Sequence, residues 1–360
     1  MSMADTAFAD APGRVNLIGE HTDYHQGFVL PTVIPLRARA FLTRRSDRRV
    51  RAASTTIGSG FEEYELGREQ RGRGWLDYIQ GITVILAREG ITVPGFDLRI
   101  ESAVPLGAGV SSSAALEISV LRALRDLLKF DADDRVIAGL AHAVETDFVG
   151  APVGVMDQFA VSLGQEDEAL FIDTRTLRVE SCALPPAMEM VVIDSAVPHA
   201  NAGGAYATRR RESFEAAARL GVEWLRDLDT TSMPRIAALP DVLARRARHI
   251  VTENQRVLEA VNALRAGDLP RLGALFAASH ASMRDDYETS TPEIDTLVSI
   301  AVSNAAVYGA RLTGGGFGGA VVILARKGCA RNVATTVCDA YRIRSGKDGT
   351  ILVPTNIGRE

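Results

Sequence analysis

Cysteine is scarce in this chain of 360 residues, which contains three: Cys182, Cys329 and Cys338. They show neither the C-x-x-C spacing nor the companion histidines of a zinc site. They also do not resemble the dense cysteine frameworks that stabilise small secreted domains. We therefore expect neither a structural zinc site nor a disulfide framework, and this cysteine usage favours the reducing cytoplasm.

The chain also has no excess of positive charge. The chain has 40 lysine and arginine residues against 45 aspartate and glutamate residues, which gives a formal net charge of −5. Nucleic acids and anionic membrane surfaces are bound by strongly basic surfaces. The short basic runs at residues 44–49 and 208–213 are interpreted as solvated faces. We therefore expect no nucleic-acid partner and no membrane partner.

Long apolar runs are absent as well, because no stretch approaches the roughly 20 apolar residues of a membrane span. The first 14 residues lack the basic segment and apolar core of a secretion signal. An apolar fraction of 46% is nevertheless enough for a complete core. At this length two domains are expected rather than one. We predict an α+β protein with domains at 1–177 and 178–360 and a cleft between them.

Hydrophobic periodicity predicts a mixture of strands and helices along the whole chain. The predicted strands lie at residues 14–19, 36–45, 95–105, 170–177 and 188–197, and a further one follows the glycines near 314–319. The predicted helices lie at residues 74–90, 134–150, 207–221, 242–268, 269–287 and 292–304, and a further long helix opens from the glycine–serine loop within residues 106–128.

The segment GRVNLIGEHTDYHQG, residues 13–27, places Arg14, Glu20, His21 and Asp23 in and after an apolar run. This pattern predicts a buried strand that leads into a polar loop, the usual place for a site on a rigid scaffold. No H-E-x-x-H pattern or carboxylate-rich loop supports a metal site here. A mixture of acceptors and an imidazole suits the hydroxyl groups of a sugar better.

A glycine–serine loop, PLGAGVSSSAALE at residues 105–117, follows a predicted strand and opens a helix. Gly107 and Gly109 would let the backbone approach a ligand, and the N–H groups at the helix start would face an anion. The hydroxyls of residues 111–113 could bind phosphate or a magnesium ion. The segment matches neither G-x-x-x-x-G-K-[ST] nor G-x-G-x-x-G. It is either a phosphate loop of another kind or an ordinary capped helix after a tight turn.

A second glycine cluster, LTGGGFGGAVV at residues 312–322, has five glycines in the six positions 314–319. A single turn does not need so many glycines. The cluster therefore predicts close backbone packing against another loop, with a flexible hairpin as the alternative.

Two carboxylates stand out in the middle of the chain. Asp157 is the one acid in an apolar stretch, and burying it is costly unless it is paired. Arg14 is an available partner, and a nearby guanidinium would keep the carboxylate ionised and ready to accept a proton. Glu145 could be a magnesium ligand, although its spacing alone favours a surface acid.

Four stretches, taken together, resemble the motifs of galactokinases in their order: GRVNLIGEHTDYHQGFVLP, VPLGAGVSSSAALE, GVMDQF and LTGGGFGGA. Galactokinases belong to a wider superfamily that includes homoserine and mevalonate kinases. The first motif is specific to the galactokinase branch, whereas the glycine–serine loop is specific only to the superfamily. The resemblance covers nearly the whole chain. It implies a two-domain small-molecule kinase with its active site in the cleft, which transfers the γ-phosphoryl group of ATP to the anomeric hydroxyl of D-galactose.

The resemblance also implies roles for individual residues. Asp157 matches the catalytic base, and Arg14 matches the arginine that stabilises this base and the transferring phosphoryl group. Ser113 and Glu145 match ligands of Mg²⁺. The implied sugar contacts are Glu20, His21, Asp23, Gly154 and Tyr206, and the implied ATP phosphate loop consists of Gly107, Ala108, Gly109, Val110, Ser111, Ser112 and Ser113.

Two positions depart from the family pattern. His25 stands where the family usually has Asn, and Val153 stands where it usually has Cys. Both lie beside implied sugar contacts, so a kinase for N-acetylgalactosamine or arabinose remains an alternative. A non-catalytic sugar sensor is a second alternative, but such relatives have damaged glycine–serine loops, and this loop is complete. We expect a cytoplasmic monomer that acts on a small-molecule sugar and ATP.

Overall fold

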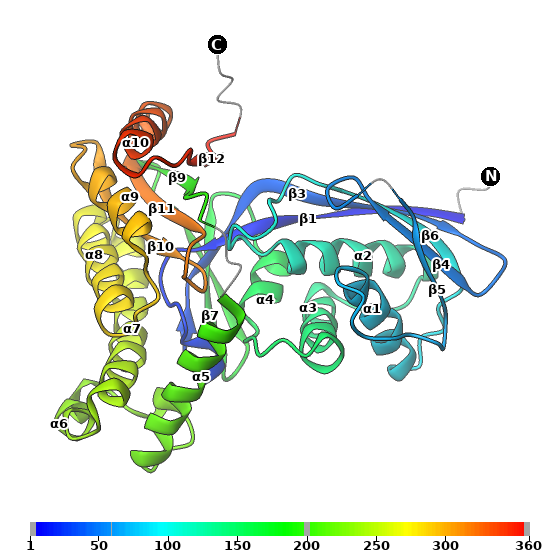
Figure 1. Ribbon diagram of the computed structural model, residues 1–360, viewed down its shortest axis with the longest axis horizontal. Coiled ribbons are helices and arrows are strands. Elements are labelled where there is room, and N and C mark those ends of the chain that lie inside the picture. The colour runs from blue at the N-terminus through cyan, green and yellow to red at the C-terminus, as the bar shows by residue number, and fades with distance from the viewer. Residues whose placement is uncertain (1–4, 59, 198–201, 356–360) are drawn as a thin grey trace. The chain divides into compact units, whose positions relative to one another are not determined.

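The computed structural model describes residues 5–58, 60–197 and 202–355, and it contains both sheets and helices (Figure 1), so the predicted α+β class is confirmed. The chain forms two compact units. Unit 1 consists of the residues up to Arg14 together with Val33–Pro105 and Ser111–Gly164, and unit 2 consists of Val15–Thr32, Leu106–Val110 and the residues from Gln165 onward. The units are therefore not separated by a single cut of the chain near residue 177.

Unit 1 is built on a twisted sheet in which β1 and β3 are the longest strands. β3 pairs antiparallel with β6, from Ala38 opposite Ser102 to Arg44 opposite Phe96, and β1 pairs with β3. β6 pairs in parallel with β4, and β4 pairs antiparallel with β5. The parallel pair requires a crossover, which α1 supplies between β5 and β6. The bounds are β1 Thr6–Asn16, β3 Pro31–Arg44, β4 Arg49–Ser54, β5 Glu62–Glu65 and β6 Phe96–Ser102.

The helices of unit 1 cover one side of these strands, as Figure 1 shows for α1, α2 and α3. Ala38, Ala40 and Leu42, which alternate along β3, are almost fully buried. A π-helix at Val144–Val149 continues α3. The bounds are α1 Leu76–Arg88, α2 Ser112–Leu128, α3 Asp134–Ala143 and α4 Met156–Leu163.

Unit 2 contains two groups of antiparallel strands and most of the long helices. One sheet has the order β10-β11-β9-β12, and its core of valines and isoleucines packs against α9 and α10. In the other group, β7 pairs with both β2 and β8. The strands are β2 Phe28–Val29, β7 Glu168–Asp173, β8 Arg178–Ala183, β9 Met188–Asp194, β10 Val307–Thr313, β11 Ala320–Arg326 and β12 Thr350–Val353. The helices are α5 Ala202–Arg219, α6 Met233–Ala237, α7 Asp241–Ala266, α8 Leu269–Asp285, α9 Pro292–Val302 and α10 Ala330–Ser345.

A bilayer crossing needs a long and strongly apolar helix, and none of the helices in the described ranges meets that requirement.

Candidate functional site

The pairing of Arg14 with Asp157 predicted from the sequence is confirmed, within unit 1. The Nε and Nη2 groups of Arg14 donate to Oδ1 of Asp157 at 2.9 and 2.6 Å. The second oxygen, Oδ2, accepts from the hydroxyl of Ser111 at 2.5 Å. The Arg14 side chain is only 5% exposed, whereas that of Asp157 is 31% exposed. The result is a carboxylate that is fixed by charge and hydrogen bonds but remains accessible to a substrate.

The glycine–serine loop leads into α2 through left-handed backbone conformations. Gly107 and Gly109 both have φ = 72°, and Ser111 has φ = 60°, which is uncommon for a residue with a side chain. Ser111 is the N-cap residue of α2, but its side chain does not cap the helix and bonds Asp157 instead. The first turn of α2 also contains no acidic residue. Neither a capping side chain nor an acidic side chain therefore offsets the positive end of the α2 dipole, which favours binding of an anion there.

The close packing predicted for the second glycine cluster is confirmed at Gly314. A Cβ atom on Gly314 would lie only 2.9 Å from the carbonyl oxygen of Gly109 in the glycine–serine loop. Gly314 also has φ = 85°, so a side chain there would be strained even without this contact. The cluster is thus a backbone support for the loop rather than a free hairpin.

Glu145 is buried, so the interpretation of it as a surface acid is wrong. It lies in the first turn of the π-helix, and such segments are frequent at functional sites. Burial raises the pKa of Glu145 to about 7; a hydrogen bond with Ser113 lowers it and the charge of Asp157 raises it. A divalent cation beside Glu145 would favour the ionised form. The pair of a hydroxyl and a buried carboxyl is a chemically suitable donor set for Mg²⁺.

The ring of His21 is held in one tautomer within unit 2. Its Nε2 lies 3.1 Å from the carbonyl oxygen of Gly315, and a carbonyl can only accept, so Nε2 carries the proton. Nδ1 then accepts from the hydroxyl of Tyr24 at 2.9 Å, and Tyr24 accepts from Tyr287 at 2.8 Å. Burial lowers the pKa of His21 to about 3, so the ring is neutral at pH 7. The Tyr206 ring lies 5.3 Å from it, centroid to centroid.

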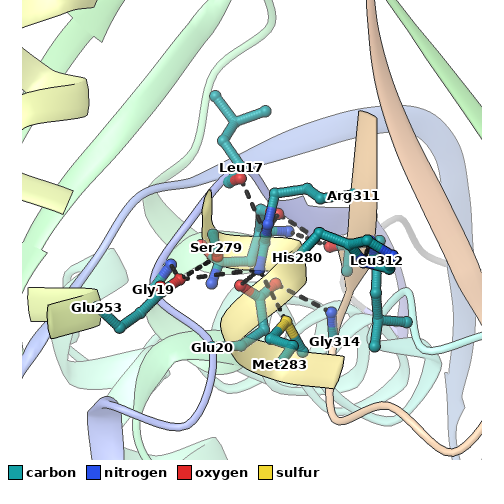
Figure 2. Close-up of polar contacts among 12 residues, drawn as sticks. Leu17, Gly19, Glu20, Glu253, Ser279, His280, Met283, Arg311, Leu312 and Gly314 are labelled. Carbon is teal, nitrogen blue, oxygen red and sulfur yellow. Dashed lines mark hydrogen bonds and ion pairs between the residues drawn. The ribbon is translucent and has the colours of Figure 1, made fainter. Parts of the chain in front are cut away.

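Glu20 belongs to a buried ion-pair cluster around Arg311, which Figure 2 shows. Nη1 of Arg311 donates to the carbonyl oxygens of Leu17 and Asn16 at 2.9 and 3.2 Å, and Nη2 donates to Oε2 of Glu20. Oε1 of Glu20 accepts from the backbone N–H of Gly314 at 3.1 Å. Burial raises the pKa of Glu20, and Arg311 offsets only part of this effect. Both oxygens of Glu20 thus hold the polar loop to β10 and the glycine cluster.

Glu253 on α7 completes this cluster. Its Oε1 accepts from the backbone N–H of Gly19 at 3.0 Å and from Ser279 at 2.6 Å, and it lies 3.8 Å from Arg311. Its Oε2 accepts from Arg256 at 2.6 Å. Burial would raise the pKa of Glu253, but nearby positive groups, led by Arg256, lower it to about 2. The fully buried carboxylate is therefore ionised and balances the charge of Arg311.

We expect Arg311→Met to lower the free energy of unfolding by about 3–5 kcal/mol, because it leaves Glu20 and Glu253 in the interior without their shared cation. Chemical denaturation at pH 7 measures this change. The control is Arg271→Met, which breaks an ion pair with Glu259 whose side chains are 54% and 33% exposed and should cost less than about 1 kcal/mol. Equal losses in the two variants would contradict the structural role of Arg311.

The remaining implied sugar contacts lie in three different elements. Asp23 begins a short 3₁₀-helix, Asp23–His25, and its partly exposed carboxylate accepts from the N–H of Tyr24 at 3.0 Å. Tyr206 is on α5 and is also partly exposed. Gly154 lies in the loop before α4. The structure thus brings His21 and Tyr206 together in unit 2, and Arg14, Asp157 and Ser111 together in unit 1.

His25, the departure from the family pattern, is fully buried against α5. Its Nδ1 accepts from the N–H of Leu225 at 3.4 Å, so Nε2 donates to the hydroxyl of Ser213 at 2.8 Å. The ring stacks on Phe214 with centroids 4.3 Å apart. His25 therefore links the 3₁₀-helix that carries Asp23 to α5, the helix that carries Tyr206.

The buried His25 should make the protein less stable in acid. Burial lowers its pKa to about 3, whereas the unfolded chain takes up the proton near pH 6.5. Between these values the unfolded state binds more protons, so the contribution of His25 to stability falls as the pH falls. We expect His25→Asn to reduce the slope of unfolding free energy against pH by about 1.4 kcal/mol per unit between pH 4 and 6. Parallel curves for the two proteins in denaturation titrations would refute this assignment.

Several residues around these groups escaped the sequence analysis. Arg311 and Glu253 are far from residues 13–27 in sequence, and no local pattern pairs them with that loop. Glu117 had a recognisable signal, because it is one acid within the apolar helix AALEISVL. Its side chain and that of Gln158 are fully buried.

Comparisons with known proteins identify the family of this chain. Residues 2–44 match the family description "Galactokinase galactose-binding signature", residues 77–165 match "GHMP kinases N terminal domain", and residues 260–343 match "GHMP kinases C terminal". A galactokinase from Roseiflexus sp. (strain RS-1) is 42% identical over 351 residues, which span 95% of this chain and 89% of that protein. The chain belongs to the galactokinase family.

Solved structures agree with this membership. The crystal structure of Lactococcus lactis galactokinase complexed with galactose superimposes with a TM-score of 0.92 at 33% identity, over 96% of this chain and 92% of that one. A mevalonate kinase structure superimposes with a TM-score of 0.70 at 17% identity, over 96% of this chain and 97% of that one, and shows the shared fold alone. The two-domain α+β kinase fold expected from the resemblance is therefore confirmed.

Proposed function

We propose that this chain transfers the γ-phosphoryl group of ATP to the anomeric hydroxyl of D-galactose, giving galactose 1-phosphate and ADP. Membership of the galactokinase family makes it an ATP-dependent kinase. The observation that carries the proposed chemistry is the pair of Arg14 and Asp157, in which an accessible carboxylate is held 2.6 Å from a buried guanidinium. A positioned carboxylate beside a fixed cation is what proton acceptance and phosphoryl transfer both require.

In the proposed reaction Asp157 accepts the proton of the anomeric hydroxyl. The sugar oxygen forms its bond to the γ-phosphorus, and the bond from that phosphorus to the bridging oxygen breaks, so that ADP leaves with the bonding electrons. Arg14 keeps Asp157 in place and offers positive charge to the transferring group. Ser111 fixes the second oxygen of Asp157, and it joins the base to the start of α2, where we place the ATP phosphates.

The phosphates of ATP are proposed to lie at the glycine–serine loop, residues 107–113, and at the first N–H groups of α2. Ser113 and Glu145 are proposed to hold Mg²⁺, which would neutralise part of the phosphate charge when bound. Among the described residues, no group of three or more histidine, cysteine or acidic side chains is arranged to hold a metal ion. This is compatible with Mg²⁺, which usually takes one or two carboxylates together with substrate phosphates and waters.

Recognition of the sugar is proposed to rest on Asp23, His21, Tyr206 and Gly154. The partly exposed carboxylate of Asp23 can accept from sugar hydroxyls, and the neutral ring of His21 is fixed by its own hydrogen bonds. Glu20 is 2% exposed and both of its oxygens have protein partners, and His21 is 5% exposed with both ring nitrogens bonded to protein. A contact of either residue with sugar therefore stays a prediction, and their anchoring of the loop comes first. We further propose that the chain acts as a cytoplasmic monomer, a location that its scarce cysteine supports.

Identification of the product tests this proposal. Purified chain, ATP, Mg²⁺ and D-galactose should give one phosphorylated sugar, whose ³¹P spectrum shows coupling to the anomeric proton. A phosphate on C6, or release of ADP without a phosphorylated sugar, would contradict the proposed reaction.

A further inference from the structure

Glu117 is a buried acid with no hydrogen-bond partner. It lies on α2 one turn after Ser113, its side chain is fully buried, and neither carboxyl oxygen has a partner among the described residues. Gln158, next to Asp157 on α4, is also fully buried, and both polar atoms of its amide lack a partner. Buried polar groups are nearly always hydrogen-bonded, because leaving one unpaired is costly. Two such groups together call for an explanation.

These two side chains adjoin the proposed magnesium ligands. Burial and then the charge of Glu145 raise the pKa of Glu117 well above its usual range, and the charge of Asp157 adds to this effect. The amide of Gln158 is near enough to lower the pKa of both Glu117 and Glu145 without making a hydrogen bond of ordinary geometry. Glu117, Gln158 and Glu145 thus form one buried polar cluster in unit 1, beside the partly exposed Asp157.

The side chains of this cluster are too few to coordinate a metal ion fully, but they are suited to a cation that keeps part of its hydration shell. Its side chains do not surround a metal by themselves. Mg²⁺ releases its waters reluctantly and usually keeps several of them when a protein binds it. The hydrogens of those waters need acceptors, and the side-chain oxygens of Glu117 and Gln158 make no hydrogen bond of ordinary geometry to the described residues.

We propose that Glu117 and Gln158 are positioning residues for the divalent cation, which they hold through waters of its hydration shell rather than directly. The inference rests on the proposed function, since it takes Ser113 and Glu145 as the direct ligands. Outer groups of this kind orient the ligands of a metal site, and their loss typically weakens metal binding by about 10–100-fold.

The test measures binding of Mn²⁺, as a spectroscopic substitute for Mg²⁺, to the protein saturated with a non-hydrolysable ATP analogue. Glu117→Met removes both acceptors and keeps the length of the side chain, and we expect it to weaken Mn²⁺ binding by about tenfold or more. Glu117→Gln keeps one acceptor and should lose less. The matched control is Ser119→Ala, a fully buried position on the same helix whose hydroxyl bonds the carbonyl of Leu116, and it should leave Mn²⁺ affinity unchanged.

The melting temperature of the protein without metal and nucleotide distinguishes this role from a purely structural role of Glu117. Without metal and nucleotide, an acid that has no protein partner can be replaced by a methionine without loss, so the melting temperature of Glu117→Met should be unchanged or higher. Failure of the metal-free variant to fold would overturn the proposal, because it would reveal a structural partner. Mn²⁺ affinity within about threefold of the unmutated protein would overturn it equally.

These outcomes are separable from failure of the proposed function. If the unmutated protein does not phosphorylate galactose but its Mn²⁺ affinity depends on Glu117, the sugar assignment is wrong and the inference stands. If galactose is phosphorylated and the Glu117 variants bind Mn²⁺ normally, the inference alone is wrong.

Discussion

Replacement of Asp157 by Asn should lower the turnover number by about 10²–10⁴-fold and leave ATP binding nearly unchanged. The change removes proton acceptance, the contribution expected of a general base, and keeps the size of the side chain. The fold should tolerate it, because the amide oxygen can accept from Arg14 while its NH₂ group donates to the hydroxyl of Ser111. The start of α2, where we place the phosphates, is untouched. Steady-state kinetics and titration with an ATP analogue measure the two effects.

The control for this variant is Asp147→Asn. Asp147 is another aspartate of unit 1 in an ion pair with an arginine, Arg88, but its side chain is 48% exposed. It should lose almost no activity, because an exposed ion pair contributes little. Turnover of Asp157→Asn within tenfold of the unmutated protein would remove Asp157 from the role of base.

Most long periodic segments were predictable from the sequence, although the 16-residue α10 and most of the 11-residue β1 were missed, and most short or interrupted segments were not predictable. The helix expected at 242–268 is α7, and the one expected at 292–304 is α9. The short strands β4 and β5 and the eight-residue α4 were not identified, because so few residues carry little periodicity. The helix expected at 134–150 exists, but its last part is a π-helix, which no pattern of apolar spacing distinguishes.

At the candidate site, chemistry was predictable where a charge stood alone among apolar residues. That reasoning paired Arg14 with Asp157, as the structure confirms. It failed for Glu145, because a helix-terminal acid has the same local pattern whether it is exposed or buried. The partners of Glu20 could not be found locally either, since Arg311 lies 291 residues away. Contacts of that range are decided by how the chain folds, not by spacing.

Sugar selectivity should be high. When ionised, the short side chain of Asp23 accepts hydrogen bonds and cannot donate them. Facing a sugar hydroxyl, it would lose one hydrogen bond with an analogue that presents that hydroxyl in the other orientation. A hydrogen bond to a charged group contributes about 1.5–3 kcal/mol. We expect at least about tenfold selectivity for each such contact. Selectivity should be greater where the rings of His21 and Tyr206 also restrict the space available to the sugar.

Asp23→Ala should therefore lower galactose turnover and reduce the preference for galactose over glucose. A matched control is Asp126→Ala, which removes an aspartate on α2 whose side chain is 52% exposed. It should change neither quantity. If Asp23→Ala retains the full preference, recognition of the sugar must be assigned to other residues.

The most direct test of the central claim is the ratio of kcat/KM for D-galactose to that for D-glucose, measured on the unmutated protein together with N-acetylgalactosamine and arabinose. We predict that galactose is preferred over glucose by at least about 100-fold, the product of two lost contacts, and over the other two sugars as well. Comparable values for glucose and galactose, or a clear preference for N-acetylgalactosamine or arabinose, would contradict the assignment of this chain as a galactose 1-kinase.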